Sequence, residues 1–380
     1  MISGRWLSGS FLLFLAALSF DAVPARASEA NPAVSQVDIF RSGEDGYHTY
    51  RIPALIMTRK GTLLAFCEGR KNSSSDTGDI DTVLKRSLDN GKTWSKMQIV
   101  ADFGPDTIGN PAPVVEQRSG TIILLLTRNP GHESERQFID GTSTGTRTVW
   151  ISRSVDDGAS WSAPEEITSS TKQPGWTWYA TGPGNGIQLR SGRLVVPCDH
   201  ATRGEKIWNS HVIYSDDRGR TWRIGGTAGP GMDESAVVEL PDGSLLLNMR
   251  TTLKRNRRGV SRSRDAGLTW SEPVLDDELI EPACQGSMIR AGLSKRSTGI
   301  LFSNPADKKR VRMTVRLSLD QGNTWPVARL IHEGPSAYSS LAGMRHELIG
   351  LLYERGESNP YERIAFARFK MKWLLEAIKK

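Results

Sequence analysis

Five copies of one eight-residue pattern constrain the fold of this 380-residue chain more than any other feature. The pattern is Ser-x-Asp-x-Gly-x-(Thr/Ser)-Trp, and it occurs at residues 87–94, 154–161, 215–222, 263–270 and 318–325. In each copy the Asp side chain can accept hydrogen bonds from backbone N–H groups of a tight turn, and the Gly can take a positive φ. The Trp can then fold back as a large apolar side chain. Because the copies begin 48 to 67 residues apart, the pattern predicts a repeated unit with one such turn per repeat.

Short apolar runs lie between these turns and are predicted to be β-strands. They occupy residues 61–66, 120–126, 192–196, 243–248 and 347–353. A repeat of this length with about four strands is typical of a β-propeller blade. We therefore expect an all-β fold, a six-bladed β-propeller in which one blade lacks the turn pattern. The first strand, residues 37–40, and the last, residues 364–369, are expected to pair and close the ring.

The two ends of the chain differ from the repeats. Arg5, an apolar stretch at residues 11–20 and a small-x-small sequence at residues 25–27 predict a secretory signal peptide over residues 1–27. We expect residues 28–36 to be an N-terminal linker, residues 37–370 the single propeller domain and residues 371–380 a short helical tail. The apolar stretch is shorter than the ~20 residues of a membrane span. We therefore expect an exported protein (secreted, periplasmic or at the cell surface) with no membrane span.

Charge and cysteine content narrow the possible partners. The formal net charge is +7, but the basic residues form no long run, and with export this favours anionic sugars over nucleic acid. The three cysteines, Cys67, Cys198 and Cys284, are too few for a disulfide scaffold. We expect buried free thiols, with oxidation of one pair left open. The six histidines lack metal-ligand spacing and no Gly-rich phosphate loop opens a helix, so we expect neither a metal nor a cofactor.

One arginine stands at the start of the predicted domain, in the sequence Tyr50-Arg51-Ile52-Pro53. Pro53 disfavours the α conformation in the chain just ahead of it, so we expect Arg51 on a short extended stretch that leads into a strand. A guanidinium held in this way can bind a carboxylate through two parallel hydrogen bonds. The motif alone also fits a surface arginine, so residues elsewhere in the chain decide between the two interpretations.

The Arg-Ile-Pro motif together with repeated turns of this kind, called Asp boxes, resembles the sialidase (neuraminidase) superfamily. The resemblance covers nearly the whole mature chain. It is strengthened by Gly69-Arg70 with Asp76 downstream, by residues 232–235, 239–243 and 248–250, and by Tyr338 ahead of residues 352–354. These stretches are similar to those of bacterial and animal-type exo-α-sialidases. The resemblance implies a six-bladed propeller that binds the sugar over its axis, with the Asp boxes on the rim.

Sialic acid carries a carboxylate on its anomeric carbon, and the resemblance implies three arginines that bind this group. Arg51 matches the first of them and Arg250 the second. The third lies just ahead of the last Asp box, where we place it at Arg310. Arg312 is left as the alternative, because alternation along a strand puts both side chains on one face. Arg70 matches an additional arginine at the wall of the site.

The resemblance also implies the chemical roles. Asp76 matches the acid/base, Tyr338 the nucleophile, and Glu234 the residue that takes the proton of the tyrosine. Glu354 matches an acid that pairs with Arg51 and orients it. A neutral phenol avoids the repulsion that a carboxylate nucleophile would meet from the substrate's own carboxylate, and sialidases are an exception to the two-carboxylate rule for glycosidases.

Some neighbouring residues complicate these assignments. Asp79 and Asp81 lie close to Asp76 in the sequence and compete with it for the role of acid/base. Residues 110–113 and 179–186 also fit the family pattern, and the second of these stretches is expected to form part of the wall of the site.

These residues together predict a retaining exo-α-sialidase, a glycoside hydrolase that releases terminal α-linked sialic acids through a covalent tyrosyl intermediate. We expect a monomer that acts on sialylated glycoproteins, glycolipids or oligosaccharides. Two alternatives are a non-catalytic propeller that binds glycans and a hydrolase or trans-glycosylase of a related ulosonic acid. An acid, a base and a nucleophile together favour an enzyme, because a binding module needs none of them.

Overall fold

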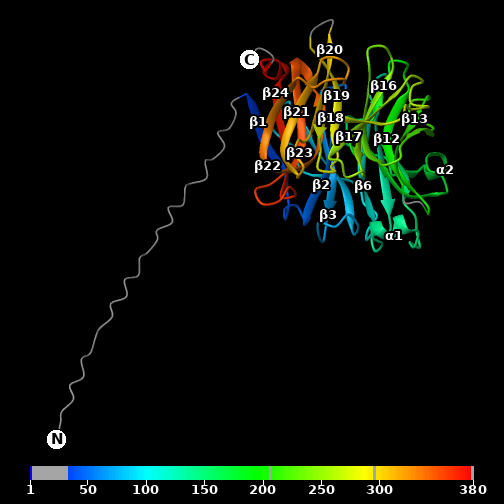
Figure 1. The fold of residues 1–380 in the computed structure, drawn as a ribbon. Coiled ribbons are helices and arrows are strands. Elements are labelled where there is room, and N and C mark those ends of the chain that lie inside the picture. Colours follow the sequence, from blue (N-terminus) through cyan, green and yellow to red (C-terminus); the bar gives the residue numbers. More distant parts are fainter. Residues whose placement is uncertain (2–32, 205–206, 294–296, 378–380) are drawn as a thin grey trace. The chain divides into compact units, whose positions relative to one another are not determined.

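Strands make up most of the regular structure. The computed structural model describes Met1 and residues 33–204, 207–293 and 297–377 (Figure 1). The predicted signal peptide, residues 1–27, lies outside the described residues apart from Met1. The described ranges hold 24 strands, three short α-helices and one 3-10 helix, which confirms the prediction of an all-β fold. No helix within them is long and apolar enough to cross a membrane.

Two sheets contain most of the first half of the chain. The larger runs in the order β2-β3-β4-β6-β7-β8-β9, with β5 paired to β4, and the smaller in the order β10-β12-β13-β14, with β11 paired to β12. The strands of the larger sheet are β2 (Thr49–Met57), β3 (Leu63–Arg70), β4 (Ile80–Ser87), β5 (Gln98–Ala101), β6 (Thr107–Val115), β7 (Ile122–Asn129), β8 (Thr148–Ser154) and β9 (Glu165–Glu166). Those of the smaller sheet are β10 (Trp176–Thr181), β11 (Ile187–Gln188), β12 (Leu194–Thr202), β13 (Trp208–Ser215) and β14 (Arg223–Ala228).

The remaining strands form two further sheets, with the orders β15-β16-β17-β18 and β1-β24-β23-β22-β21-β20-β19. Their strands are β1 (Val34–Arg41), β15 (Met232–Glu239), β16 (Leu245–Thr251), β17 (Arg257–Ser263), β18 (Val274–Ile280), β19 (Ser287–Gly292), β20 (Thr298–Pro305), β21 (Val311–Ser318), β22 (Val327–Gly343), β23 (Leu348–Arg355) and β24 (Arg363–Lys370). The helices are α1 (Glu135–Asp140), α2 (Thr168–Thr171), η1 (Arg345–Glu347) and α3 (Met371–Leu375).

Nearly all pairing joins strands that are close in the sequence. Within the described residues the ladders are antiparallel except between β4 and β6, which meet in parallel at the single pair Ile80 and Thr107. The long strand β22 pairs with β21 through its first part and with β23 through its second part. The apolar core is divided among clusters between neighbouring groups of strands, such as the one that joins Phe66 of β3 to Leu124 of β7. Groups of strands that follow one another in the sequence therefore pack against each other through apolar faces.

The five Asp boxes form the same hydrogen-bonded turn. In the fourth copy Ser263 Oγ donates to Asp265 (2.8 Å), and the N–H of Gly267 donates to Ser263 Oγ (2.9 Å). Thr269 donates to Asp265 from its N–H (2.9 Å) and its hydroxyl (2.6 Å). The five glycines have φ between 77° and 89°, and a Cβ on Gly91 would lie 2.1 Å from the ring of Phe366. The positive φ requires glycine, as predicted, and the close approach is a second reason that the structure adds.

The first and last strands pair, which confirms the expected pairing. In the antiparallel ladder Val34 of β1 lies opposite Phe369 of β24, and Arg41 lies opposite Arg363. The predicted linker over residues 28–36 is wrong at its C-terminal end, because β1 already begins at Val34. The physical reason is that Val34 is buried in the same apolar cluster as Phe369, and this contact holds the chain in the ladder.

The C-terminal helix is shorter than the predicted tail. Helix α3 spans Met371–Leu375 and buries Met371, Trp373 and Leu374, while residues 376 and 377 lie beyond it and residues 378–380 lie outside the described part. Its first turn is held by packing against the last sheet, as the apolar cluster with Phe369 shows. The three cysteines are buried free thiols, as expected from the sequence.

Candidate active site

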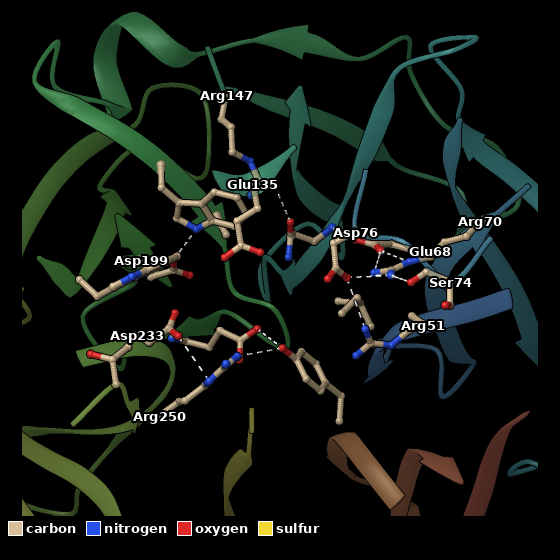
Figure 2. A pocket seen from close by; sticks show the side chains of 18 of the residues that line it. Arg51, Glu68, Arg70, Ser74, Asp76, Glu135, Arg147, Asp199, Asp233 and Arg250 are labelled. Atoms are coloured by element: carbon tan, nitrogen blue, oxygen red, sulfur yellow. Dashed lines mark hydrogen bonds and ion pairs between the residues drawn. The ribbon is translucent and has the colours of Figure 1, made fainter. Parts of the chain in front are cut away.

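One cavity of about 460 Å³ collects most of the residues that the sequence singled out (Figure 2). It is lined by Arg51, Arg70, Asp76, Glu234, Arg250, Arg310 and Tyr338. They come from β2, β3, β15, β16, β22 and the loops that follow β3 and β20. Residues almost 290 positions apart in the sequence therefore meet at one place. Of the two stretches that fit the family pattern less directly, Asn110 and Ala180 also line the cavity.

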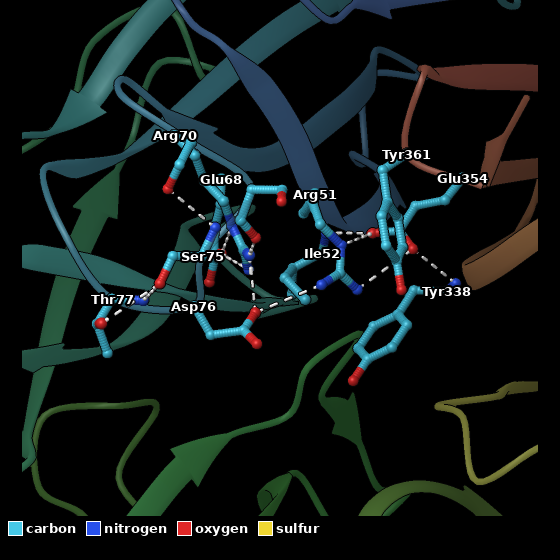
Figure 3. A network of polar contacts seen from close by, with 12 residues as sticks. Arg51, Ile52, Glu68, Arg70, Ser75, Asp76, Thr77, Tyr338, Glu354 and Tyr361 are labelled. Atoms are coloured by element: carbon cyan, nitrogen blue, oxygen red, sulfur yellow. Dashed lines mark hydrogen bonds and ion pairs between the residues drawn. The ribbon is translucent and has the colours of Figure 1, made fainter. Parts of the chain in front are cut away.

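The expected pairing of Arg51 with Glu354 is present (Figure 3). Arg51 Nε donates to Glu354 Oε1 at 3.1 Å, and Glu354 is fully buried behind the cavity. Glu354 Oε2 also accepts from the backbone N–H of Tyr338 at 3.0 Å. The guanidinium lies over the ring of Tyr361, with Cζ 4.1 Å from the ring centre. One carboxylate thus fixes the positions of both Arg51 and the backbone of Tyr338.

The backbone just before Pro53 departs from the extended conformation expected there. Ile52 has φ 60°, in the left-handed region that β-branched residues resist, and the ladder register shifts between Arg51 and Ala54. Such an irregularity in a strand re-aims the neighbouring side chain. The N–H of Ile52 donates to Glu354 Oε1 at 2.9 Å, so the same carboxylate stabilises this conformation.

Tyr338 and Glu234 are joined by a short hydrogen bond. The tyrosine hydroxyl donates to Glu234 Oε1 at 2.5 Å. Arg250 Nη1 donates to the tyrosine oxygen at 3.2 Å and to Glu234 Oε2 at 2.9 Å. Burial, together with the charge of Glu234, raises the pKa of Tyr338 well above its ordinary value. The phenol therefore keeps its proton at neutral pH, and Glu234 is placed to accept that proton.

Asp76 lies between two arginines. Its Oδ1 is 2.7 Å from Arg70 Nη1 and 3.4 Å from Arg51 Nη1, and its side chain is 56% exposed. Burial opposes its ionisation, but the charges of Arg70 and Arg51 outweigh that effect and hold the pKa of Asp76 below its ordinary value. Arg70 is itself held by Glu68, whose Oε2 accepts from its Nη2 at 2.7 Å.

The two competing aspartates lie apart from this cavity. Asp79 and Asp81 pair with Lys71 at 2.9 and 3.2 Å, and neither lines the cavity. Asp81 also accepts from the hydroxyl of Tyr47 at 2.6 Å. Asp76 is thus the only one of the three aspartates whose carboxylate reaches the arginines.

The structure separates the two candidates for the third arginine. Arg310 lines the cavity, where its Nη1 donates to the hydroxyl of Tyr361 at 2.6 Å and its Cζ lies 5.6 Å from the ring centre of Tyr338. Arg312 points elsewhere and pairs with Glu333 at an exposed position. Side chains do not alternate regularly here, because Arg312 has φ 64°, which breaks the regular strand geometry.

The opposite side of the cavity is acidic and aromatic, and of its residues only Asp233 lies in a motif recognised from the sequence. Its residues are Glu135, Arg147, Trp178, Asp199, Trp208 and Asp233. Figure 2 shows Asp199 and Asp233 across the cavity from Arg51 and Arg70. Trp178 Nε1 donates to Asp199 at 2.9 Å, and the guanidinium of Arg147 stacks 3.8 Å from the ring centre of Trp178. A carboxylate within the apolar run of β12 was the available signal, since a fully buried Asp is rare without a partner.

Burial changes the protonation of this side of the cavity. It raises the pKa of Asp199 well above its ordinary range, and the nearby charges of Asp233 and Glu234 add to the effect. Burial also raises the pKa of Asp233 to about 7, although Arg250 opposes this. A protonated carboxyl can donate a hydrogen bond as well as accept one, so these two groups can bind either an acceptor or a donor of a polar substrate.

Comparison with known proteins gives this cavity a family context. The family model described as "BNR repeat-like domain" matches residues 61–353. The chain is 34% identical to a sialidase of Micromonospora viridifaciens over 90% of its own length and 55% of that protein. It is 33% identical to an exo-alpha-sialidase of Aspergillus fumigatus over 92% of its own length and 93% of that protein.

A solved structure agrees with the sequence relatives. The Hadza microbial sialidase Hz136 superposes with a TM-score of 0.82 at 34% identity, covering 89% of this chain and 69% of that one. The chain spans only 55% and 62% of the length of the two bacterial sialidases that it matches, from M. viridifaciens and Bacteroides fragilis. The family model covers residues 61–353, and the relatives and the superposition each cover about nine-tenths of the chain. The chain therefore belongs to the sialidase superfamily.

Proposed function

We propose that the chain is an exo-α-sialidase that hydrolyses terminal α-linked sialic acids with retention of configuration. The observation that carries this proposal is the 2.5 Å hydrogen bond from Tyr338 to Glu234, in the same cavity as the clustered arginines. A phenol beside a carboxylate base suits attack on a carbon that bears a carboxylate. Two fungal relatives carry the name exo-alpha-sialidase.

In this proposal Arg51, Arg250 and Arg310 bind the substrate carboxylate. Arg250 donates to the oxygen of Tyr338, and the guanidiniums of Arg51 and Arg310 lie 5.1 and 5.6 Å from the centre of its ring. A carboxylate bound among them has its attached carbon near that oxygen. Hydrogen bonds to charged groups contribute about 1.5–3 kcal/mol each, so three arginines supply both affinity and orientation.

The reaction then needs two substitutions at the anomeric carbon. In the first, the oxygen of Tyr338 bonds to that carbon, its proton passes to Glu234, the glycosidic C–O bond breaks and the leaving oxygen takes a proton from Asp76. In the second, water attacks the same carbon and gives a proton to Asp76, the bond to the tyrosine breaks, and the proton on Glu234 returns to the phenolate. Two inversions give net retention.

The acid role of Asp76 depends on the substrate in this mechanism. The carboxyl is ionised in the free protein, because Arg70 and Arg51 hold its pKa down. A bound substrate carboxylate neutralises part of that positive charge and raises the pKa of Asp76. The exposed side chain of Asp76 can take up the proton from water before the glycosidic bond breaks.

We further propose that the strands close into a six-bladed propeller. The groups β2–β5, β6–β9, β10–β14, β15–β18 and β19–β22, with a last group of β22–β24 and β1, are each consistent with one blade. The Asp-box glycine of one group packs on the preceding group, as Gly158 does on Leu64 and Gly219 on Ile123. Gly91 of the first group packs on Phe366 of the last group, and this contact supports closure.

We also propose that residues 1–27 direct export and that the enzyme acts as a monomer on sialylated glycoproteins, glycolipids or oligosaccharides. The apolar stretch at residues 11–20 and the small-x-small sequence at residues 25–27 support export. The arginine cluster supports an anionic sugar as the recognised group.

Release of a fluorogenic phenol and of lactose from two α-sialosides tests the activity. We expect wild-type turnover of both substrates and its loss in Tyr338→Phe, which lacks the attacking oxygen. Asp76→Ala should lower kcat/KM, which reports the first substitution, about 10²–10⁴-fold with lactose and far less with the phenol, which leaves without a proton. Its kcat should fall with both substrates, because Asp76 also activates the water of the second substitution. Proton NMR of the first product formed should show retained configuration.

Two arginine variants provide the matched control. Arg310→Ala should lower kcat/KM about tenfold or more, whereas Arg312→Ala, which changes an exposed ion pair, should leave it unchanged. Full activity in Tyr338→Phe would contradict the mechanism. Binding of sialylated glycans by the wild type without any turnover would instead favour a glycan-binding propeller.

A further inference from the structure

A second buried carboxylate, Glu281, links two parts of the site. It follows β18, is 1% exposed, and begins a stretch that we call the support segment, residues 281–285. Glu281 Oε1 accepts from the N–H of Thr251 at 2.8 Å, and Thr251 is the residue after Arg250. Glu281 Oε2 accepts from the N–H of Cys284 at 3.3 Å, inside the support segment. The carboxylate therefore ties the end of β16 to the support segment.

Arg258 of β17 completes this link and is fully buried. Its Nη1 donates to Glu281 Oε2 at 3.0 Å and to the carbonyl of Cys284 at 2.7 Å. Its Nε donates to Asn248 Oδ1 at 2.7 Å, two residues before Arg250. A buried ion pair whose donors and acceptors are satisfied in this way fixes geometry more than it adds stability.

The support segment in turn contacts the other reactive residues. The carbonyl of Ala283 accepts from Arg310 Nη2 at 3.3 Å, and Cys284 packs against Tyr338 in an apolar cluster. Gln285 Oε1 accepts from the N–H of Ser339 at 3.0 Å, immediately after Tyr338. Ala283 has φ 52°, a left-handed conformation that persists only when its surroundings impose it.

We propose that the buried ion pair of Arg258 and Glu281 positions the reactive side of the cavity. It holds Arg250 through the adjacent backbone, and it holds Arg310 and Tyr338 through the support segment. Arg258 and Glu281 do not line the cavity, so they act through these residues and are positioning residues. The inference rests on the proposed sialidase function. A displacement of about 1 Å in a site of this kind costs about 10²-fold in rate.

Glu281→Gln in the full chain tests the inference, because it keeps the shape of the side chain and removes its charge. We expect kcat/KM for the fluorogenic sialoside to fall about 10²-fold. If the pair acts through Arg310, then Arg310→Ala should lower kcat/KM by a much smaller factor in the Glu281→Gln variant than in the wild type. Leu125→Ala, a buried change in β7, is the control: it should lower Tm but leave kcat/KM and the cost of Arg310→Ala unchanged.

A second variant separates folding from positioning. Arg258→Met with Glu281→Leu replaces the pair by apolar side chains, which proteins often tolerate without loss of stability. We expect this double variant to fold and still lose about 10²-fold in kcat/KM. Wild-type kcat/KM in either folded variant, or additive effects with Arg310→Ala, would overturn the inference.

Crystal structures of the wild type and the folded variant give a readout that does not depend on turnover. We expect the carbonyl of Ala283 and the guanidinium of Arg310 to move relative to Arg250 in the variant. Unchanged positions would overturn the inference even if the wild type proved inactive on sialosides. Absence of wild-type turnover, with these positions shifted in the variant, would count against the sialidase function alone.

Discussion

Among single residues, Glu354 joins Arg51 to the backbone of Tyr338. Its two oxygens accept from the side chain of Arg51 and from the backbone N–H groups of Ile52 and Tyr338. The side chain is 0% exposed, so water cannot replace a partner that is lost. An amide of the same shape would turn an –NH₂ group toward one set of these donors. The charge of Glu354 is therefore as important as its size.

Glu354→Gln should lower both stability and substrate binding. Because it removes the buried counter-charge of Arg51 and leaves only the more distant, half-exposed Asp76, we expect the free energy of unfolding to fall by about 3 kcal/mol and KM for a sialoside to rise. Urea denaturation and steady-state kinetics measure the two effects. Glu333→Gln removes the exposed partner of Arg312 and should cost less than about 1 kcal/mol. Equal, small losses in both variants would contradict the role of Glu354.

At the scale of elements, β12 and β13 separate the cavity from a buried histidine pair. Asp199 of β12 lines the cavity, while the next residue, His200, stacks on Trp176 with ring centres 3.7 Å apart. His200 Nδ1 lies 3.0 Å from His211 Nδ1 of β13, so one ring donates and the other accepts. Burial lowers the pKa of His200 to about 3, and burial followed by the charge of His200 lowers that of His211.

Acid should therefore destabilise this part of the molecule. Unfolded histidine titrates near pH 6.5, so as pH falls from about 6.5 toward 3 the unfolded chain binds protons that the folded pair cannot. Each histidine then removes up to about 1.4 kcal/mol of stability per pH unit. Asp233 acts in the opposite direction, because its raised pKa lets the folded state bind a proton below about pH 7. Asp199, whose pKa burial also raises, acts in the same direction as Asp233, so the net slope reflects all of these groups.

A variant isolates the contribution of the histidines. In His200→Gln with His211→Gln, we expect Tm at pH 7 to fall because buried packing is lost, and the decline of Tm between pH 6.5 and 4.5 to become shallower. Thermal unfolding at several pH values measures both changes. Asp233 is present in both proteins, so its contribution to the pH dependence of Tm cancels in the comparison. Parallel Tm curves for the two proteins would show that the histidine pair does not titrate on unfolding.

At the scale of the whole molecule, the first strand, β1, pairs with the last strand, β24. Its ladder with β24 completes the last sheet, and Ile39 and Phe40 pack in one apolar cluster with residues of β2, β3 and β24. Val34, Ile39 and Phe40 are all buried. At about 1.5–3 kcal/mol for each buried side chain, they contribute an amount comparable to the 5–15 kcal/mol that stabilises a typical domain.

A chain that begins at residue 42 should consequently be much less stable than one that begins at residue 33. We expect the shorter chain to unfold at a lower temperature and to associate, because the edge of β24 is left unpaired. Tm and size-exclusion chromatography report these effects. A synthetic peptide of residues 33–41 should restore Tm by pairing with the exposed edge. Equal Tm for the two chains would contradict the role of β1.

Local patterns in the sequence predicted the local geometry well. Each Asp box forms a defined set of hydrogen bonds within eight residues, so these turns can be predicted from the sequence alone. Pairing of the first and last strands followed from the repeat. The start of β1 was missed because the contact of Val34 with the cluster of Phe369 decides it, and no local pattern reveals such a contact. The end of α3 was missed as well.

Only part of the candidate site was predicted, because some of its residues lie outside any recognisable motif. Arg51, Tyr338 and their companions were found through family motifs, whereas Asp199 and Trp178 lie in strands whose sequences look like ordinary core. The left-handed residues Ile52 and Arg312 were also missed. Their conformations are stabilised or set by the surrounding chain, and for Ile52 the partner, Glu354, lies 302 residues away.

The turns, the strand content and the family can be inferred from the sequence, because each depends on residues close together in the chain or on recognisable motifs. Which residues share the cavity depends on the folded molecule, since Arg51, Glu234 and Tyr338 meet through the packing of whole sheets. The choice of Arg310 over Arg312 belongs to the same class. So does the support of the site by Arg258 and Glu281, because a buried carboxylate acts through partners that only folding brings within hydrogen-bonding distance.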